Sequence, residues 1–197
     1  MSSPPTEERF KRNFVTLVEI CEEMVQIGYE NNVCSLTPTM FSILKILVKN
    51  INSKILIERF IKKTYGHWDK IQEKDIEYFK TMGADLFNIA ESKGMDNVLS
   101  SEDKSITNGL SFNHVSLFKQ LLGATYSENG VDVDIFDDER ISDTWKIMHS
   151  FVKQSIAYIH NNRKMVDGDY TNDYFSNVNV KENASKWKVK TVLSDVN

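Results

Sequence analysis

The chain has 197 residues, with 24 Lys and Arg against 28 Asp and Glu, so its formal net charge at neutral pH is -4. This length suits a single domain, and the slight acidic excess argues against a binder of duplex nucleic acid, which usually carries a basic surface. Apolar residues make up 41% of the chain. That fraction is slightly low for a fully packed domain and predicts that part of the chain lies outside the core.

Neither a targeting segment nor a membrane-spanning segment is expected. Residues 1–14 lack the apolar core of a secretory signal. The longest uncharged run, residues 31–44, is short and partly polar, whereas a bilayer span needs about 20 apolar residues. Cys21 and Cys34 do not suggest a disulfide framework, and Cys21 lies on the apolar side of a predicted helix. An intracellular, reducing location is therefore the default expectation.

The distribution of proline favours long helices. The three prolines all lie within the first 38 residues, so nothing later removes a backbone donor. Thr6 is expected to cap a first helix whose opening turn holds Glu7 and Glu8, where the helix dipole favours carboxylates. The apolar residues that share one face of this helix are Phe10, Phe14, Leu17, Val18, Cys21, Met24 and Val25.

Thr37-Pro38 is the clearest start signal, because it places an N-cap residue before a proline at the first helical position. Apolar residues between Met40 and Ile51 cover most of the circumference of the helix that follows. This pattern predicts that the second helix runs through the centre of the core.

Asn52-Ser53 is expected to end the second helix and to cap a third, which spans residues 55–65. Gly66 then either kinks the third helix or separates it from another helix between residues 68 and 79. Residues 83–111 give the least clear pattern, and residues 112–122 form a compact apolar stripe that predicts a further short helix.

Asn129-Gly130 is a turn signal, and the alternation that follows it from Val131 to Ile135 predicts a short strand or an extended loop. Helical periodicity returns over residues 137–162. Beyond Asn161 the chain is rich in Asn, Asp and Lys. Residues 161–197 are therefore expected to form an extended or disordered tail, which docks on a partner or on its own domain.

These patterns predict an all-α fold. We expect a disordered N-terminus over residues 1–5 and a single helical bundle domain of about six helices over residues 6–160. The irregular C-terminal tail, residues 161–197, completes the chain.

No catalytic, cofactor-binding or metal-binding motif stands out, and the function is expected to be non-enzymatic, with no cofactor and no metal. His149 and His160 share a helix face but lie three turns apart, too far to bind one metal ion. The densest acidic cluster does not match a calcium-binding EF-hand loop, since Asp137 stands where that loop needs glycine. We interpret it as a solvated loop before a helix. Its members are Asp132, Asp134, Asp137, Asp138 and Glu139.

The most informative segment is His67-Trp68-Asp69-Lys70. Trp68 follows Ile57, Ile61 and Tyr65 at helical steps of three and four, which predicts that it packs inward. Under this interpretation Asp69 caps the next helix. The alternative is that His67, Trp68, Asp69 and Lys70 form a partner-binding patch.

A resemblance to a known group rests on this segment. Ile57-Glu58-x-Phe60-Ile61 and His67-Trp68-Asp69-Lys70-Ile71, followed by Asp75 and Phe79, resemble a stretch of small α-helical proteins of large DNA viruses, a group without an assigned activity. The resemblance includes no catalytic motif. It implies a viral origin, a role in the virion or in host interaction, and a location in the host cytoplasm or the virion.

We therefore expect a protein-interaction or assembly protein that binds a protein partner or itself. One alternative is a helical groove binder of the Bcl-2 type, which takes up a partner helix. Gly109-Leu110-Ser111-Phe112 lies near where such a protein carries Asn-Trp-Gly-Arg, but the Trp and Arg are missing. Another alternative is a viral protein associated with nucleic acid, although the net charge argues against nucleic acid as a partner.

Overall fold

The computed structural model describes residues 4–34, 37–79, 121, 123–165 and 178–193. Most of these residues are helical, and the one sheet among them has two strands, so the predicted all-α class is confirmed. Residues 83–111, which give the least clear pattern, and the short helix predicted over residues 112–122 lie outside the described residues, apart from the buried Leu121.

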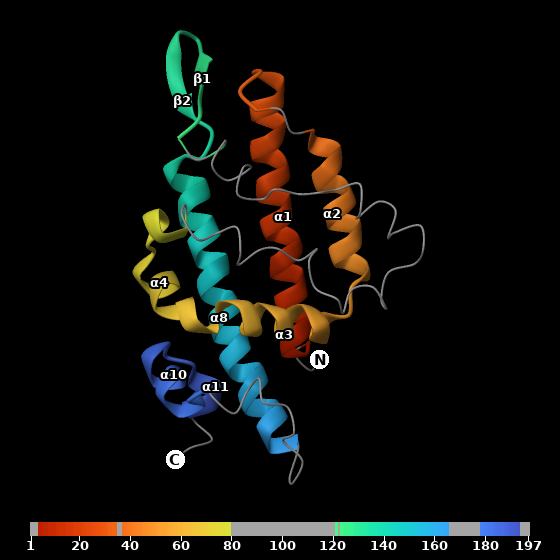
Figure 1. Cartoon of the computed structure of the whole chain (residues 1–197), viewed down its shortest axis with the longest axis vertical. Helices are drawn as coiled ribbons and strands as arrows, with labels where there is room; N and C mark the ends of the chain where they lie inside the picture. Colours follow the sequence, from red (N-terminus) through yellow and green to blue (C-terminus); the bar gives the residue numbers. More distant parts are fainter. Residues whose placement is uncertain (1–3, 35–36, 80–120, 122, 166–177, 194–197) are drawn as a thin grey trace.

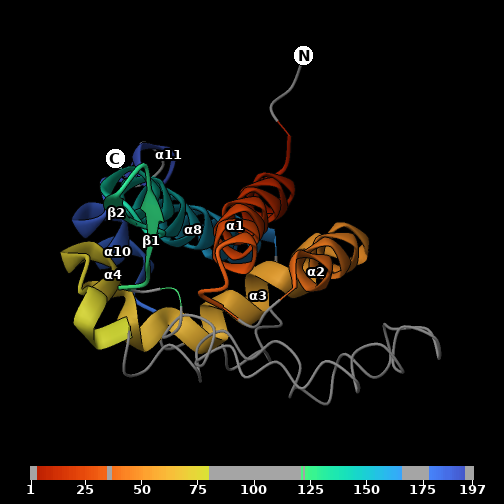
Figure 2. The same ribbon diagram turned by 90° about the horizontal axis from the view of Figure 1, so that it is seen from above.

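Three long helices run roughly along the longest axis of the molecule (Figure 1). They are α1 (Thr6–Glu30), α2 (Pro38–Asn50) and α8 (Asp138–Met165). The helix α3 (Ser53–Thr64) crosses them near the N-terminus of α1, as Figures 1 and 2 show. Because α1 contacts α2, α3 and α8, it is the central helix of the described part of the chain.

The expected central place of the second helix is wrong. In the described part of the chain α2 packs mainly on α1, and Ile46 on its outer side is 58% exposed. Phe41 and Val48 are its buried residues that face the core. An apolar circumference predicts burial, but it does not say how many neighbours a helix has.

The centre of the core is a cluster of four phenylalanines from three helices. The Phe10 ring of α1 lies 4.5 Å from the ring of Phe151 in α8 and 5.3 Å from the ring of Phe60 in α3, measured between centroids. Phe14, also on α1, stacks on Phe151 with 5.8 Å between the ring centroids. Such aromatic contacts add about 0.5–1.5 kcal/mol per pair beyond the burial of their area.

Two predicted helix starts are confirmed. Thr37 is the N-cap of α2 with Pro38 in its first turn, and the side chain of Asn52 caps α3 by accepting a hydrogen bond from the Lys54 backbone at 2.9 Å. Thr6 is not a cap, since it is itself the first residue of α1 and is buried. Its hydroxyl accepts a hydrogen bond from Arg9 at 3.3 Å.

Gly66 separates two helices, which was one of the two expected outcomes. It lies in a single 3-10 turn, η1 (Tyr65–His67), between α3 and α4 (Trp68–Glu73). The expected single helix as far as Phe79 is wrong, because Lys74 has a left-handed backbone with φ of 56° and ends α4. A new helical turn begins after Asp75, whose side chain accepts a hydrogen bond from the Tyr78 backbone at 2.9 Å.

The turn predicted at Asn129-Gly130 joins two strands, β1 (Thr125–Glu128) and β2 (Val131–Asp134), in an antiparallel hairpin. Both turn residues have positive φ, 54° and 81°, as the mirror-image turns of two-residue hairpins require. After the hairpin, Asp137 accepts a hydrogen bond from the Arg140 backbone at 2.8 Å and so caps α8.

The tail differs from the extended or disordered segment that we expected. The helix α8 continues to Met165, and residues 178–193 form α10 (Val180–Lys186) and α11 (Lys190–Leu193), which both pack on α8. Val178, Ala184, Trp187 and Val192 are buried there. These helices are too short to show a helical repeat in the sequence, so their apolar residues looked isolated. The expected alternative, docking on its own domain, holds for these residues.

Candidate functional site

Trp68 anchors the segment that the sequence singled out. It is 2% exposed, and its indole N–H donates a hydrogen bond to the hydroxyl of Thr64 at 3.0 Å. That hydroxyl in turn donates to the carbonyl of Phe60 at 2.7 Å. Trp68 also makes an edge contact with the Tyr65 ring at 5.2 Å between centroids. The inward direction predicted for Trp68 is confirmed, so this residue is not part of an exposed patch.

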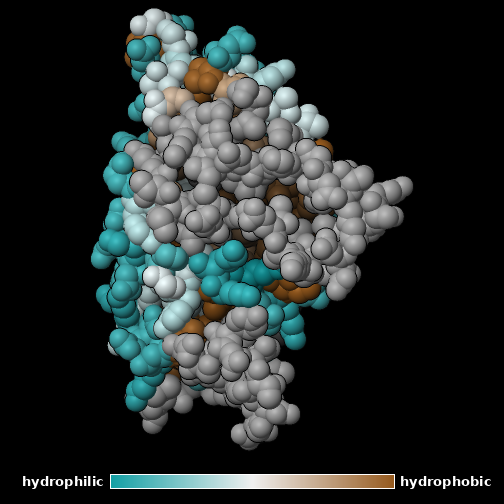
Figure 3. All heavy atoms as spheres, viewed as in Figure 1, coloured by the Kyte–Doolittle hydropathy of each residue, from teal (hydrophilic) through white to brown (hydrophobic). Residues whose placement is uncertain are grey.

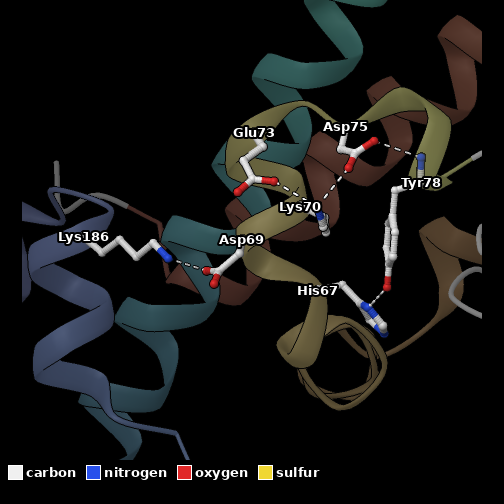
Figure 4. Close-up of polar contacts among 7 residues, drawn as sticks. All are labelled: His67, Asp69, Lys70, Glu73, Asp75, Tyr78 and Lys186. Atoms are coloured by element: carbon white, nitrogen blue, oxygen red, sulfur yellow. Dashed lines mark hydrogen bonds and ion pairs between the residues drawn. The ribbon is translucent and has the colours of Figure 1, made fainter.

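The polar residues around α4 gather on its outer side, away from the buried Trp68 and Ile71. Figure 4 shows this α4 polar cluster, and Figure 3 shows that the flank formed by α8, α4 and α10 is mainly hydrophilic. The members of the cluster are His67, Asp69, Lys70, Glu73, Asp75, Tyr78 and Lys186.

Lys70 lies in the middle of the α4 polar cluster. Its ammonium group is 3.1 Å from a carboxylate oxygen of Glu73 and 3.0 Å from one of Asp75. The same nitrogen lies 5.7 Å from the centre of the Tyr78 ring. The Lys70 side chain nevertheless remains 40% exposed, so its charge is held in place and is still accessible.

The sequence suggested that Asp69 caps the helix after Gly66. This prediction is wrong, because α4 already begins at Trp68 and Asp69 is its second residue. Its carboxylate forms an ion pair with Lys186 of α10, a residue far away in the sequence. Gln72 donates to the carbonyl of the same lysine at 3.5 Å. These contacts join the C-terminal helices to α4.

Burial of Trp187 holds α10 in position beneath this polar contact. Trp187 is 3% exposed, and its ring makes a T-shaped contact with the His149 ring at 5.4 Å between centroids. A ring nitrogen of His149 lies 2.9 Å from the carbonyl oxygen of Ile71 in α4. His149 therefore links α8, α4 and the C-terminal segment, which is a structural role.

His67 points along the surface toward Tyr78. Its Nδ1 atom and the Tyr78 hydroxyl form a hydrogen bond, and both residues are half-buried. The four residues of the predicted patch therefore have different environments. Trp68 is inside, His67 contacts Tyr78, and Asp69 and Lys70 belong to separate ion pairs.

The electrostatics of the α4 polar cluster favour its charged forms. The backbone N–H of Tyr78 and then the Lys70 ammonium lower the pKa of Asp75. Hydrogen bonds to Asp75 and then to Glu73 raise the pKa of Lys70. Both shifts move away from neutrality, whereas a general acid or base works best with a pKa near the working pH.

The other candidate residues are dispersed. Asp137 pairs with Arg140, while Asp132 and Asp134 are exposed on the hairpin. Residues 109–112, which were compared with the Bcl-2 type, lie outside the described residues. Within the described ranges no group of three or more His, Cys, Asp or Glu side chains is arranged to hold a metal ion.

The two cysteines are both free. Cys34 is buried and Cys21 is half-buried on α1, and desolvation of the Cys21 thiol raises its pKa to about 12. A thiol with such a pKa is almost entirely protonated at neutral pH, and the thiolate is the nucleophile. The predicted place of Cys21 on the apolar side of the first helix agrees with this environment.

Comparison with known proteins finds no matching family model, no matching curated protein and no matching solved structure. The resemblance of residues 57–79 to viral proteins therefore stays a prediction. Among the described helices, none combines the length and the apolarity that crossing a bilayer requires.

Proposed function

We propose that this protein is a non-enzymatic interaction or assembly protein, and that it binds a protein partner through the α4 polar cluster. The observation that carries the proposal is the state of Lys70, which is 40% exposed and yet held between two carboxylates. Ordering a long side chain on binding costs about 0.5–1.5 kcal/mol. A lysine that is already ordered avoids part of this cost.

The packing of α4 beneath the α4 polar cluster also favours a role in binding a protein partner. The buried side of α4 fixes its orientation, and the Asp69–Lys186 ion pair connects it to α10. A binding surface built on rigid elements keeps its geometry better than a surface on a loop. The exposed groups are therefore presented in one arrangement.

The mixture of charges favours a protein over a nucleic acid. The cluster combines two lysines with three carboxylates, whereas phosphate backbones select surfaces with a strong excess of Lys and Arg. A folded partner with its own mixed charges can complement both signs, and such complementarity mainly provides specificity. A role in the virion or in host interaction is the biological setting that the resemblance of residues 57–79 suggests.

Charge reversal of Lys70 tests the proposal. Lys146 offers a matched control, since it is also an exposed lysine that pairs with a carboxylate three residues away, Asp143, but it lies on α8. Tagged parent, Lys70→Glu and Lys146→Glu chains would be used to capture partners from the source cells, or from infected cells if the source is a virus. Captured proteins would be identified by mass spectrometry.

The expected result is a partner that the parent and Lys146→Glu capture and Lys70→Glu does not. All three chains should melt at similar temperatures, because surface ion pairs contribute little to stability. Equal capture by both variants would show that the α4 polar cluster is not the contact surface. Salt-sensitive retention on immobilised DNA would instead favour the nucleic-acid alternative.

A further inference from the structure

The β1–β2 hairpin is a second exposed surface, at the end of the molecule where α8 begins (Figure 1). In Figures 1 and 2, β1 lies on the side of α1 and β2 is the outer strand. No other strand in the described part of the chain pairs with either of them. An exposed strand edge offers unpaired backbone groups that another chain can use.

The direction of these backbone groups follows from the register of the hairpin. The backbone N–H of Ile135 donates to the carbonyl of Ala124 at 2.9 Å, so these two residues are a hydrogen-bonded pair. In an antiparallel ladder such pairs alternate with pairs whose N–H and C=O groups point outward. Along β2 the outward positions are therefore Asp134 and Asp132.

The side chains of this edge have a clear pattern. Because strand residues alternate between faces, Asp132 and Asp134 share one face, and Val131 and Val133 share the other. Both aspartates are exposed, and Val131 is 63% exposed. Residues 124–139 contain Asp and Glu but no Lys or Arg. The hairpin and the residues directly after it therefore carry only negative charges.

We propose that the free edge of β2 binds an extended protein segment in which basic and apolar residues alternate, and that this segment adds a third strand to the hairpin. Hydrogen bonds to the outward groups of Asp132 and Asp134 would hold its backbone, as in other cases of strand addition. Its cations, two residues apart, would lie beside the two carboxylates. Its apolar side chains would lie beside Val131 and Val133.

Charge decides between this partner and a second copy of the chain. Pairing of two β2 edges would bring the aspartates of both copies close together, and like charges on neighbouring strands are unfavourable. A basic segment reverses the sign of this interaction. The inferred surface is separate from the α4 polar cluster, so it does not depend on the function proposed above.

A synthetic peptide with the sequence Thr-Lys-Val-Lys-Val-Lys-Thr tests the proposal on the full chain. We expect saturable binding in a titration followed by nuclear magnetic resonance, with slower hydrogen exchange at the amides of Asp132 and Asp134 and no change at Thr125 and Ser127 of β1. The control peptide has the same composition with its three lysines in one block. It should bind at least about tenfold more weakly, since it cannot match charge and backbone together.

Asp132→Pro and Asp132→Asn together separate backbone pairing from charge, because both lose the carboxylate and only the proline loses the backbone N–H. Asp132→Pro removes an outward donor without removing a hydrogen bond of the hairpin, and Thr125→Pro does the same on the β1 edge. Asp132→Pro should bind about tenfold or more weakly than Asp132→Asn, whereas Thr125→Pro should bind like the parent. If Asp132→Pro disturbs the hairpin, a peptide with N-methylated backbone amides removes the reciprocal hydrogen bonds on the unaltered protein, those from the peptide N–H groups to the carbonyls of Asp132 and Asp134.

Three results would overturn the inference. Equal binding of the alternating and block peptides would show that only overall charge matters. Binding that survives both Asp132→Pro and N-methylation would show that no strand is added. Self-association of the parent chain that Asp132→Pro abolishes would identify a second copy, rather than a basic segment, as the occupant.

Discussion

Two buried tryptophans with different hydrogen bonding offer a sharp test of the packing described above. The indole N–H of Trp68 donates to Thr64 at 3.0 Å, whereas the indole N–H of Trp187 is buried without a hydrogen-bond partner among the described residues. The two side chains are 2% and 3% exposed, so their burial is nearly equal. Replacing each with phenylalanine therefore compares similar losses of ring area with different losses of hydrogen bonding.

The expected magnitudes follow from this difference. Trp68→Phe loses a hydrogen bond worth about 1 kcal/mol in addition to the lost contacts of the larger ring. Trp187→Phe removes an unsatisfied buried donor, whose desolvation costs about 1–3 kcal/mol. This gain in stability offsets part of the stability that is lost because the phenylalanine ring makes fewer contacts. We expect Trp68→Phe to be the more destabilising substitution by about 2 kcal/mol. Trp68→Ala should cost about 3–5 kcal/mol, as large-to-small core substitutions do.

Guanidinium unfolding followed by circular dichroism measures these differences. A double-mutant cycle with Thr64→Val checks the assignment of the bond, because Thr64→Val should cost less in the Trp68→Phe background than in the parent. Equal losses for Trp68→Phe and Trp187→Phe would refute the reasoning from hydrogen bonding. A Trp68→Ala chain that melts like the parent but loses a partner would show that Trp68 is an exposed binding anchor.

Three further outcomes can be checked in the same way. Gly28→Ala should lower the melting temperature because the new Cβ would lie 2.9 Å from the Cys34 sulfur, and adding Cys34→Ala should reverse the loss. Hydrogen bonds from Lys45 and a serine lower the pKa of Glu22 below its ordinary value of 4.5. Its stabilising contribution is therefore present above pH 4.5 and is lost as the pH falls through the lowered pKa, so the deficit of Glu22→Gln in urea melts should shrink in acid; a constant deficit would contradict this. Trp187→Ala should make residues 178–193 sensitive to trypsin, while the parent resists cleavage there.

The features predicted correctly from the sequence depend on short stretches of chain. Thr37-Pro38 and Asn52 start helices, and Asn129-Gly130 forms the hairpin turn, because each acts on backbone groups only a few residues away. The inward direction of Trp68 follows from a single helical repeat. None of these predictions depends on the contacts between helices.

The incorrect predictions concern contacts between distant segments. The apolar circumference of α2 did not reveal that, among the described elements, α1 would be its main neighbour. The tail seemed irregular because α10 and α11 are short, and what orders them is the burial of residues such as Trp187 against α8. The same limit applies to the site. The sequence predicted Asp69 and Lys70 as candidate site residues. Nothing near Lys186 in the sequence indicates its ion pair with Asp69.

The hairpin was only partly predictable from the sequence, because its register depends on a local turn and its free edge depends on distant contacts. A two-residue turn fixes the register of its strands, so the outward direction of Asp132 and Asp134 follows from the sequence once the turn at Asn129-Gly130 is accepted. Which edge stays free depends on the rest of the fold. Ile135, just after β2, is buried, and a Cβ on Gly28 of α1 would lie 3.4 Å from its side chain. The base of the hairpin therefore lies close to α1, and Figures 1 and 2 show β2 as its outer strand.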